Sequence, residues 1–276
     1  MRYLDPKNDL TFKKVFGQHP HLLISLLNAL LPLPADRQIV SIEYLPAELV
    51  PTIPVFKNSI VDVRCVDRTG RQFIVEMQML WTDSFYQRVV FNASKAYVKQ
   101  IKSGEQYDQL QPVYSLNLVD DTFTPESDLA YYHHYQIVNI ANTERRIEGL
   151  EFIFIELPKY CPKNFTEKKL RALWLRYLTE IKDQSSEISP DLLEDPDIRE
   201  AVKCLEESAF TPGELNTYEA YWDTIRTERT LINDSLAQGE QIGIAKGRQE
   251  GLEIALERLI QSGIPKEDAV KMLNLP

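Results

Sequence analysis

The sequence predicts an α/β protein in which a mixed β-sheet is flanked by helices and followed by a helical C-terminal region. Two observations support this prediction. The first 120 residues show apolar patterns in the order helix, strand, hairpin, helix, strand, which is typical of a sheet covered by helices. From residue 166 onward the apolar spacing becomes helical. The chain has 276 residues, 43% of them hydrophobic, enough for one sizeable domain and an appendage.

Residues 9–31 form the first predicted helical segment, because their apolar positions recur at helical spacing. We expect a break near 17–20, where Gly17 and Pro20 occur, and an end before Pro32. A strand is predicted over 38–49, and the prolines that follow at 51 and 54 should end it.

Residues 59–79, with the sequence SIVDVRCVDRTGRQFIVEMQM, predict a β-hairpin. A two-residue loop would pair Asp62 with Val75 and place the two acidic side chains of the hairpin on opposite faces. A three-residue loop ending at Gly70 pairs Asp62 with Glu76 and supplies a glycine where a left-handed backbone is needed. The apolar alternation favours the three-residue loop, because the other register would send apolar side chains into the polar face.

In this register Asp62 and Glu76 face each other with Cβ atoms roughly 4.5–5.5 Å apart, and Gln78 follows on the same face. Two carboxylates this close repel each other unless a proton or a cation lies between them. A hard divalent metal ion held by oxygen ligands would explain the pair. The alternative is a pair of solvated surface carboxylates, with Arg64 neutralising Asp62.

A helix is predicted from Asp83 or Ser84 to about Ser103, with Gly104 ending it. Its buried stripe would consist of Phe85, Val89, Ala93, Ala96, Val98 and Ile101. The basic positions of this helix are Arg88, Lys95, Lys99 and Lys102. We expect them to form the DNA-facing surface; the alternative is that they form a solvated helix face. A further strand is predicted over 112–119.

Three motifs occur in order and resemble a known family. Residues 9–17 (DLTFKKVFG) resemble its D..FK..FG opening, residues 75–78 (VEMQ) resemble its IEMQ segment, and residues 85–107 resemble the helix that follows. The family is that of the recombination-promoting nucleases (Rpn) and related transposases, within the PD-(D/E)XK nuclease superfamily. The resemblance implies a restriction-endonuclease-like fold and a metal-dependent DNA endonuclease linked to recombination, mobile elements or defence against foreign DNA.

The resemblance also implies roles for individual residues. Asp62 and Glu76 would bind Mg²⁺ or Mn²⁺ together with the backbone carbonyl of Met77, and Gln78 would complete the catalytic set. Gln78 stands where the wider superfamily has a lysine, which leaves open which group steadies the attacking water or the transition-state charge; one option is a cation relocated to the following helix. The candidates for this and for DNA contact are Arg88, Lys95 and Lys99. From the first helix, Asp9 could supply a further acidic group. Lys13 is a further candidate through contact with a phosphate, the alternative being a solvated side chain.

The remaining chain is predicted to add two strands within 131–157 and helices from Thr166, at about 191–208 and at 213–233. Adjacent strand residues point to opposite faces, so we assign His133 and His134 to surface or packing roles rather than to one metal. We divide the chain into a nuclease-like domain (1–160), a helical extension (161–233) and a tail (234–276).

The tail carries four glycines at a spacing of four: Gly239, Gly243, Gly247 and Gly251. Each glycine costs up to about 1 kcal/mol in a helix. The stretch is therefore either a helix that packs closely against a second copy of the chain or a frayed linker. Two short helices are predicted around residues 262–265.

Composition narrows the function classes. The net charge of −10 counts against a strong non-specific DNA binder, although residues 1–110 carry 13 Lys and Arg against 11 Asp and Glu. Three widely spaced cysteines argue against a zinc site and for a reducing, cytoplasmic location. We expect neither a signal peptide nor a membrane span. The alternative to an active nuclease is a nuclease-fold protein that lost its chemistry and serves as an interaction module.

Overall fold

The computed structural model describes residues 2–47, 61–161, 169–273 and 275. The chain divides into two compact units, Met1–Trp222 and Asp223–Pro276. The expected strand-breaking prolines at 51 and 54, and the expected helix start at Thr166, lie outside the described residues.

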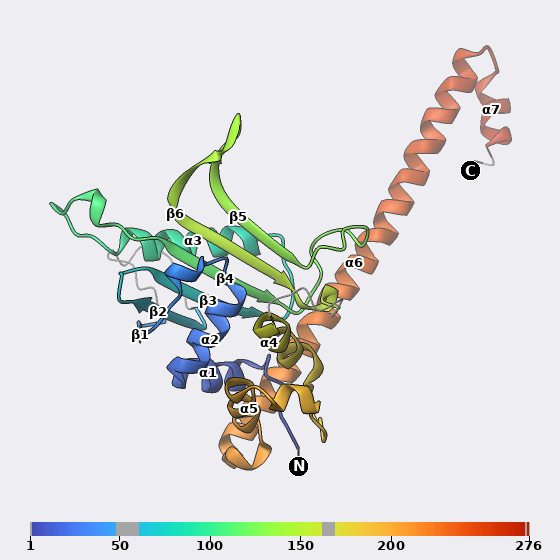
Figure 1. Ribbon diagram of the computed structural model, residues 1–276. Helices are drawn as coiled ribbons and strands as arrows, with labels where there is room; N and C mark the ends of the chain where they lie inside the picture. Colours follow the sequence, from blue (N-terminus) through green and yellow to red (C-terminus); the bar gives the residue numbers. More distant parts are fainter. Residues whose placement is uncertain (1, 48–60, 162–168, 274, 276) are drawn as a thin grey trace. The chain divides into compact units, whose positions relative to one another are not determined.

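The first unit is built on a six-stranded mixed sheet in the order β1-β2-β3-β4-β6-β5 (Figure 1). β3–β4 and β4–β6 are parallel pairs, and the other neighbours are antiparallel. The strands are β1 (Ile42–Tyr44), β2 (Val63–Asp67), β3 (Gln72–Gln78), β4 (Val113–Val119), β5 (Tyr132–Asn139) and β6 (Asn142–Glu156). The predicted mixed sheet flanked by helices is confirmed.

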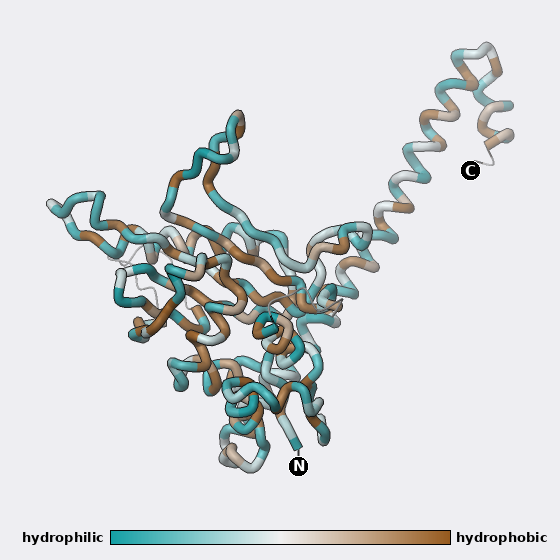
Figure 2. The backbone as a smooth tube through the Cα atoms, in the orientation of Figure 1, coloured by the Kyte–Doolittle hydropathy of each residue, from teal (hydrophilic) through white to brown (hydrophobic). Residues whose placement is uncertain are grey.

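Helices cover both faces of the sheet. On one face lies α3 (Phe85–Val98), whose Ala93 and Ala96 pack against Ile74 of β3. The other face is covered by helices from the N-terminal and the later parts of the unit (Figure 1). These are α1 (Asp9–Gln18), α2 (Pro20–Leu30), α4 (Lys169–Glu180) and α5 (Pro196–Lys203). The central strands are mostly apolar along their length (Figure 2), as expected of strands buried on both faces.

The predicted break in the first helical segment is confirmed. The side chain of Asn8 caps α1 by accepting a hydrogen bond from the Leu10 N–H at 3.0 Å. His19 separates the two helices, and Pro20 occupies the first turn of α2.

The hairpin has the predicted register. Val63 pairs with Val75 in the antiparallel ladder of β2 and β3, which sets Asp62 opposite Glu76. Gly70 has a φ of 84°, so the three-residue loop needs the left-handed conformation that glycine adopts without strain. Because β2 and β3 lie inside the sheet, both faces of the hairpin are largely buried.

Two predicted elements are shorter than expected. The first strand spans Ile42–Tyr44 only. The helix expected to reach about Ser103 ends at Val98, a residue placed in the buried stripe that is in fact 64% exposed. The side chain of Gln100 explains this end, because its amide both donates to the carbonyl and accepts from the N–H of Gln111, each at 2.8 Å. The chain therefore turns toward β4 before Gly104.

The C-terminal part of the chain is helical. α6 (Pro212–Gln261) has 50 residues, and α7 (Lys266–Met272) follows the left-handed Gly263 and Pro265. The predicted turn at 262–265 and the short helix after it are confirmed, but the helix before the turn is the end of α6 and not a short helix. α6 runs continuously through the boundary expected at 234, and its four spaced glycines are helical. Within the described ranges, none of the helices combines the length and apolarity needed to cross a bilayer.

Candidate active site

Asp62 and Glu76 form the centre of the candidate site. Asp62 is the residue just before β2, and its Oδ2 accepts a hydrogen bond of 2.7 Å from the backbone N–H of Met77. This bond fixes the Asp62 carboxylate beside β3, where Glu76 projects from the register partner position. The Asp62 side chain is 20% exposed and Glu76 only 8%. The site is therefore a pair of carboxylates that reaches solvent mainly through Asp62.

α1 brings a lysine to this pair. The Nζ of Lys13 lies 2.6 Å from Oδ1 of Asp9 and 3.9 Å from Oδ1 of Asp62. Asp9 and Lys13 are four residues apart on α1, so the helix itself sets their contact. The cation thus bridges an acidic residue of α1 and the acidic residue that precedes β2.

α3 supplies two further polar contacts to the site. Arg88 donates through Nη2 to Oε1 of Gln78, and Asn92 donates through Nδ2 to Oε1 of Glu76 at 3.3 Å. Residues four apart on a helix are separated by about 6 Å along its axis. Residues two apart on a strand are separated by about 6.6 Å. This similarity lets one face of α3 contact successive same-face residues of β3.

Burial of the two carboxylates sets their electrostatics. Burial raises the pKa of Glu76 to about 8, and the neighbouring charge of Asp62 adds to this increase. Burial likewise raises the pKa of Asp62 to about 6, with a contribution from Asp9, while the Met77 N–H and Lys13 oppose the increase. At neutral pH the site therefore lacks the positive charge needed to keep both carboxylates ionised, and a bound cation would supply it.

The chemistry of the donor atoms fits a hard divalent cation. Carboxylate oxygens are the ligands that Mg²⁺ prefers, and Mg²⁺ is often held by one or two carboxylates while keeping several waters. Among the described residues, no group of three or more His, Cys, Asp or Glu side chains has the arrangement of a metal site. Asp62 and Glu76 are the residues here that could hold such an ion, with waters completing its coordination.

The structure brings together most of the residues singled out from the sequence. Contacts or close charges join seven of them: Asp9, Lys13, Asp62, Glu76, Met77, Gln78 and Arg88. The contact described for Met77 is made by its N–H, whereas the sequence pointed to its carbonyl. Lys95 and Lys99 lie farther along, about two and three turns after Arg88, and the Nζ of Lys95 is 5.0 Å from the ring centre of Phe91.

The alternative of solvated carboxylates neutralised by Arg64 is not what the structure shows. Arg64 is buried and donates to Oε1 of Gln72 at 2.7 Å rather than to Asp62. Among the residues that the structure describes, the cation nearest to the Asp62 carboxylate is Lys13, at 3.9 Å.

Asn92 is a site residue that the sequence reasoning missed. It occupies a position within the apolar stripe of α3, four residues after Arg88. The sequence does show a polar residue in an otherwise apolar helix stripe. Its assignment to the site also requires knowing that this stripe of α3 faces Glu76.

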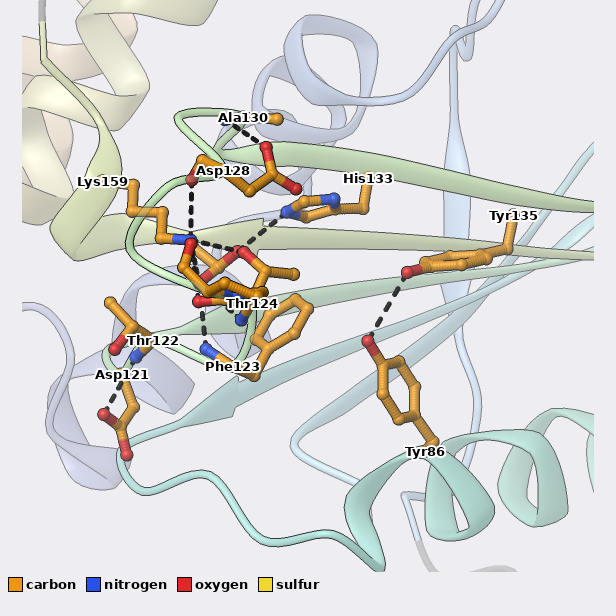
Figure 3. A network of polar contacts seen from close by, with 12 residues as sticks. Tyr86, Asp121, Thr122, Phe123, Thr124, Asp128, Ala130, His133, Tyr135 and Lys159 are labelled. Atoms are coloured by element: carbon orange, nitrogen blue, oxygen red, sulfur yellow. Dashed lines mark hydrogen bonds and ion pairs between the residues drawn. The ribbon is translucent and has the colours of Figure 1, made fainter.

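A second buried carboxylate, Glu156, has structural partners. Its side chain is fully buried and accepts hydrogen bonds from the backbone and hydroxyl of Thr124, while Lys159 lies 3.3 Å away. His133 contacts the same carboxylate at 2.9 Å. Figure 3 shows Thr124, His133 and Lys159 gathered near the loop that precedes β5. His134 contacts Glu151 instead, so the two histidines face different partners, as alternation requires.

Fold and site together define a nuclease-like α/β protein with paired acidic residues on a central hairpin. The family model described as "PD-(D/E)XK nuclease family transposase" matches residues 6–235. The chain therefore belongs to this family, and the match includes the whole sheet and every residue of the candidate site. No curated protein and no solved structure matches the chain significantly.

Proposed function

We propose that this protein is a metal-dependent endonuclease that hydrolyses phosphodiester bonds of DNA. The observation that carries the proposal is the pair of half-buried Asp62 and buried Glu76, held opposite each other with too little positive charge around them. The family supports a nuclease-like activity, and its description as transposase supports DNA as the substrate. Mg²⁺, with Mn²⁺ as a substitute, is the proposed cofactor.

When bound, the divalent ion would act as a Lewis acid and lower the pKa of a bound water. Asp62 and Glu76 would hold it, assisted in our proposal by the Met77 carbonyl. The Met77 N–H keeps the Asp62 carboxylate in a fixed orientation. Fixed ligands matter, because catalysis by electrostatic stabilisation depends on groups that need not reorganise during the reaction.

Arg88 and Lys13 are the proposed cations that replace the lysine of the wider superfamily. The amide of Gln78 is already engaged, since its Oε1 accepts from Arg88 and its Nε2 donates to the Leu80 carbonyl. Gln78 therefore holds Arg88 in place, and the remaining N–H groups of the guanidinium would bind a phosphate oxygen. Lys13 would stabilise charge from the side of α1.

DNA would approach along α3. Arg88, Lys95 and Lys99 follow this helix away from the carboxylates. Their chain region is also the least acidic, since residues 1–110 have 13 Lys and Arg against 11 Asp and Glu while the net charge is −10. The biological setting that we propose is recombination, mobile-element movement or defence against foreign DNA in the cytoplasm. Three free cysteines fit a reducing compartment.

Nicking of supercoiled and linear DNA tests this function, with Mg²⁺, Mn²⁺ or Ca²⁺ added separately. We expect cutting with Mg²⁺ or Mn²⁺ and its loss in Asp62→Ala, while circular dichroism shows that the variant is folded. Undiminished cutting by folded Asp62→Ala would refute the assignment.

A second candidate function is a catalytically inactive interaction module. α6 favours it, because several of its apolar side chains are exposed: Leu231, Leu236, Ile242, Ile244 and Ile254. The spaced glycines have open space around them, so a second copy could approach the backbone closely. Equilibrium sedimentation of the full chain and of a chain ending at Asp234 tests self-association through the tail. The same association state for both chains would exclude it.

A further inference from the structure

Asn92 is a buried amide in an apolar helix stripe. The residue is 2% exposed, and its buried neighbours on α3 include Val89, Ala93 and Ala96. A buried amide group without its hydrogen bonds destabilises the folded state, because its lost contacts with water are not replaced. An apolar side chain of similar size, such as leucine, would carry no such cost at this position.

Only one side of the Asn92 amide is satisfied. Its Nδ2 donates to Oε1 of Glu76 at 3.3 Å. This orientation suits the ionised, metal-binding form of Glu76, because a carboxylate can only accept hydrogen bonds. Its Oδ1 is buried and has no hydrogen-bond partner in the described part of the chain. Packing therefore does not explain the amide, and the unpartnered oxygen lies next to the candidate carboxylates.

We infer that Asn92 is a positioning residue of the active site. Its Nδ2 orients the Glu76 carboxylate, and its Oδ1 accepts a hydrogen bond from a water held in the site. A buried polar atom of this kind normally has a water partner when the protein cannot supply one. The inference rests on the proposed function, because the water would belong to the surroundings of the divalent ion. Arg88, one turn earlier on α3, makes the corresponding contact to β3 by donating to Gln78.

The test compares wild type with Asn92→Leu, and with Gln87→Leu as a matched control. Gln87 is an exposed amide on the same helix and contacts neither carboxylate in the described structure. Three quantities are measured for each protein: the Kd for Mn²⁺ by titration calorimetry, kcat and KM for DNA cleavage, and Tm in EDTA.

Loss of a side chain that orients a metal ligand typically costs about 10–100-fold in affinity or activity. We expect Asn92→Leu to raise the Kd for Mn²⁺ about 10-fold or more and to lower kcat while KM for DNA stays unchanged. Its Tm in EDTA should equal or exceed that of wild type, because a half-satisfied amide has been removed. Gln87→Leu should behave as wild type in the Mn²⁺ and cleavage assays.

Wild-type Mn²⁺ affinity and kcat in folded Asn92→Leu would overturn the inference and leave the proposed function standing. If leucine prevents folding, Asn92→Ala removes the same amide without added bulk, and the same readouts decide. A folded wild type that binds no Mn²⁺ and cuts no DNA would refute the proposed function and this inference together.

Discussion

Replacing Glu76 with glutamine should stabilise the protein in the absence of metal. Glutamine keeps the shape of the side chain and an oxygen that can accept from Asn92, but it removes a buried charge. Burial raises the pKa of Glu76 from an ordinary value of 4.5 to about 8. The folded state therefore binds the proton more tightly than the unfolded state, and stability falls as pH rises through this window.

The magnitude follows from the same shift. One pKa unit corresponds to about 1.4 kcal/mol. If Glu76 carried the whole shift alone, its raised pKa would lower the free energy of unfolding at pH 7.5 by about 4 kcal/mol. Asp62 shares the interaction, so we expect a gain of about 1–3 kcal/mol in the free energy of unfolding for Glu76→Gln. For domains of roughly 150–250 residues, 1 kcal/mol changes Tm by about 2–4 °C.

Thermal unfolding in EDTA at pH 5.0 and pH 7.5 measures this effect. Glu76→Gln should unfold several degrees above wild type at pH 7.5, and the difference should shrink at pH 5.0, where Glu76 is protonated when folded. Glu43→Gln, an exposed strand position, is the matched control and should change little at either pH. A lower Tm for Glu76→Gln at pH 7.5 would refute the reasoning about buried charge.

Three further outcomes are expected. Mn²⁺ should raise the Tm of wild type at pH 7.5 but not that of Asp62→Asn, measured by calorimetry; equal increases would place the ion elsewhere. Cleavage in Mg²⁺ should increase with pH between about 6 and 8, because the raised pKa values of Asp62 and Glu76 make protons compete with the metal; a flat kcat/KM profile would count against this competition. Arg88→Met should lower kcat about 10-fold or more while leaving Mn²⁺ affinity within a few-fold of wild type, and an unaffected kcat would exclude Arg88 from charge stabilisation.

The hairpin register could be predicted from the sequence because local rules determine it. Gly70 indicates a three-residue loop, in which one residue has a left-handed backbone. The apolar alternation permits only the register in which the apolar side chains of both strands lie on the same face. Those two constraints place Asp62 opposite Glu76 without any knowledge of the rest of the fold.

Contacts between distant elements could not be predicted in the same way. The approach of Lys13 to Asp62 depends on how α1 packs near β2, which no local pattern specifies. The end of α3 at Val98 depends on hydrogen bonds between Gln100 and Gln111, a side chain and a backbone eleven residues apart. Asn92 belongs to the site only because α3 packs over β3 and brings its side chain to Glu76.

Calorimetric titration of wild type and Asp62→Ala with Mg²⁺ at pH 7, in two buffers of different ionisation enthalpy, tests the central claim most directly. We predict that wild type binds the ion and releases protons to the buffer, since the raised pKa values leave the carboxylates partly protonated beforehand, and that folded Asp62→Ala does not bind. Binding of equal strength by both proteins, or no binding by folded wild type, would contradict the assignment of Asp62 and Glu76 as metal ligands.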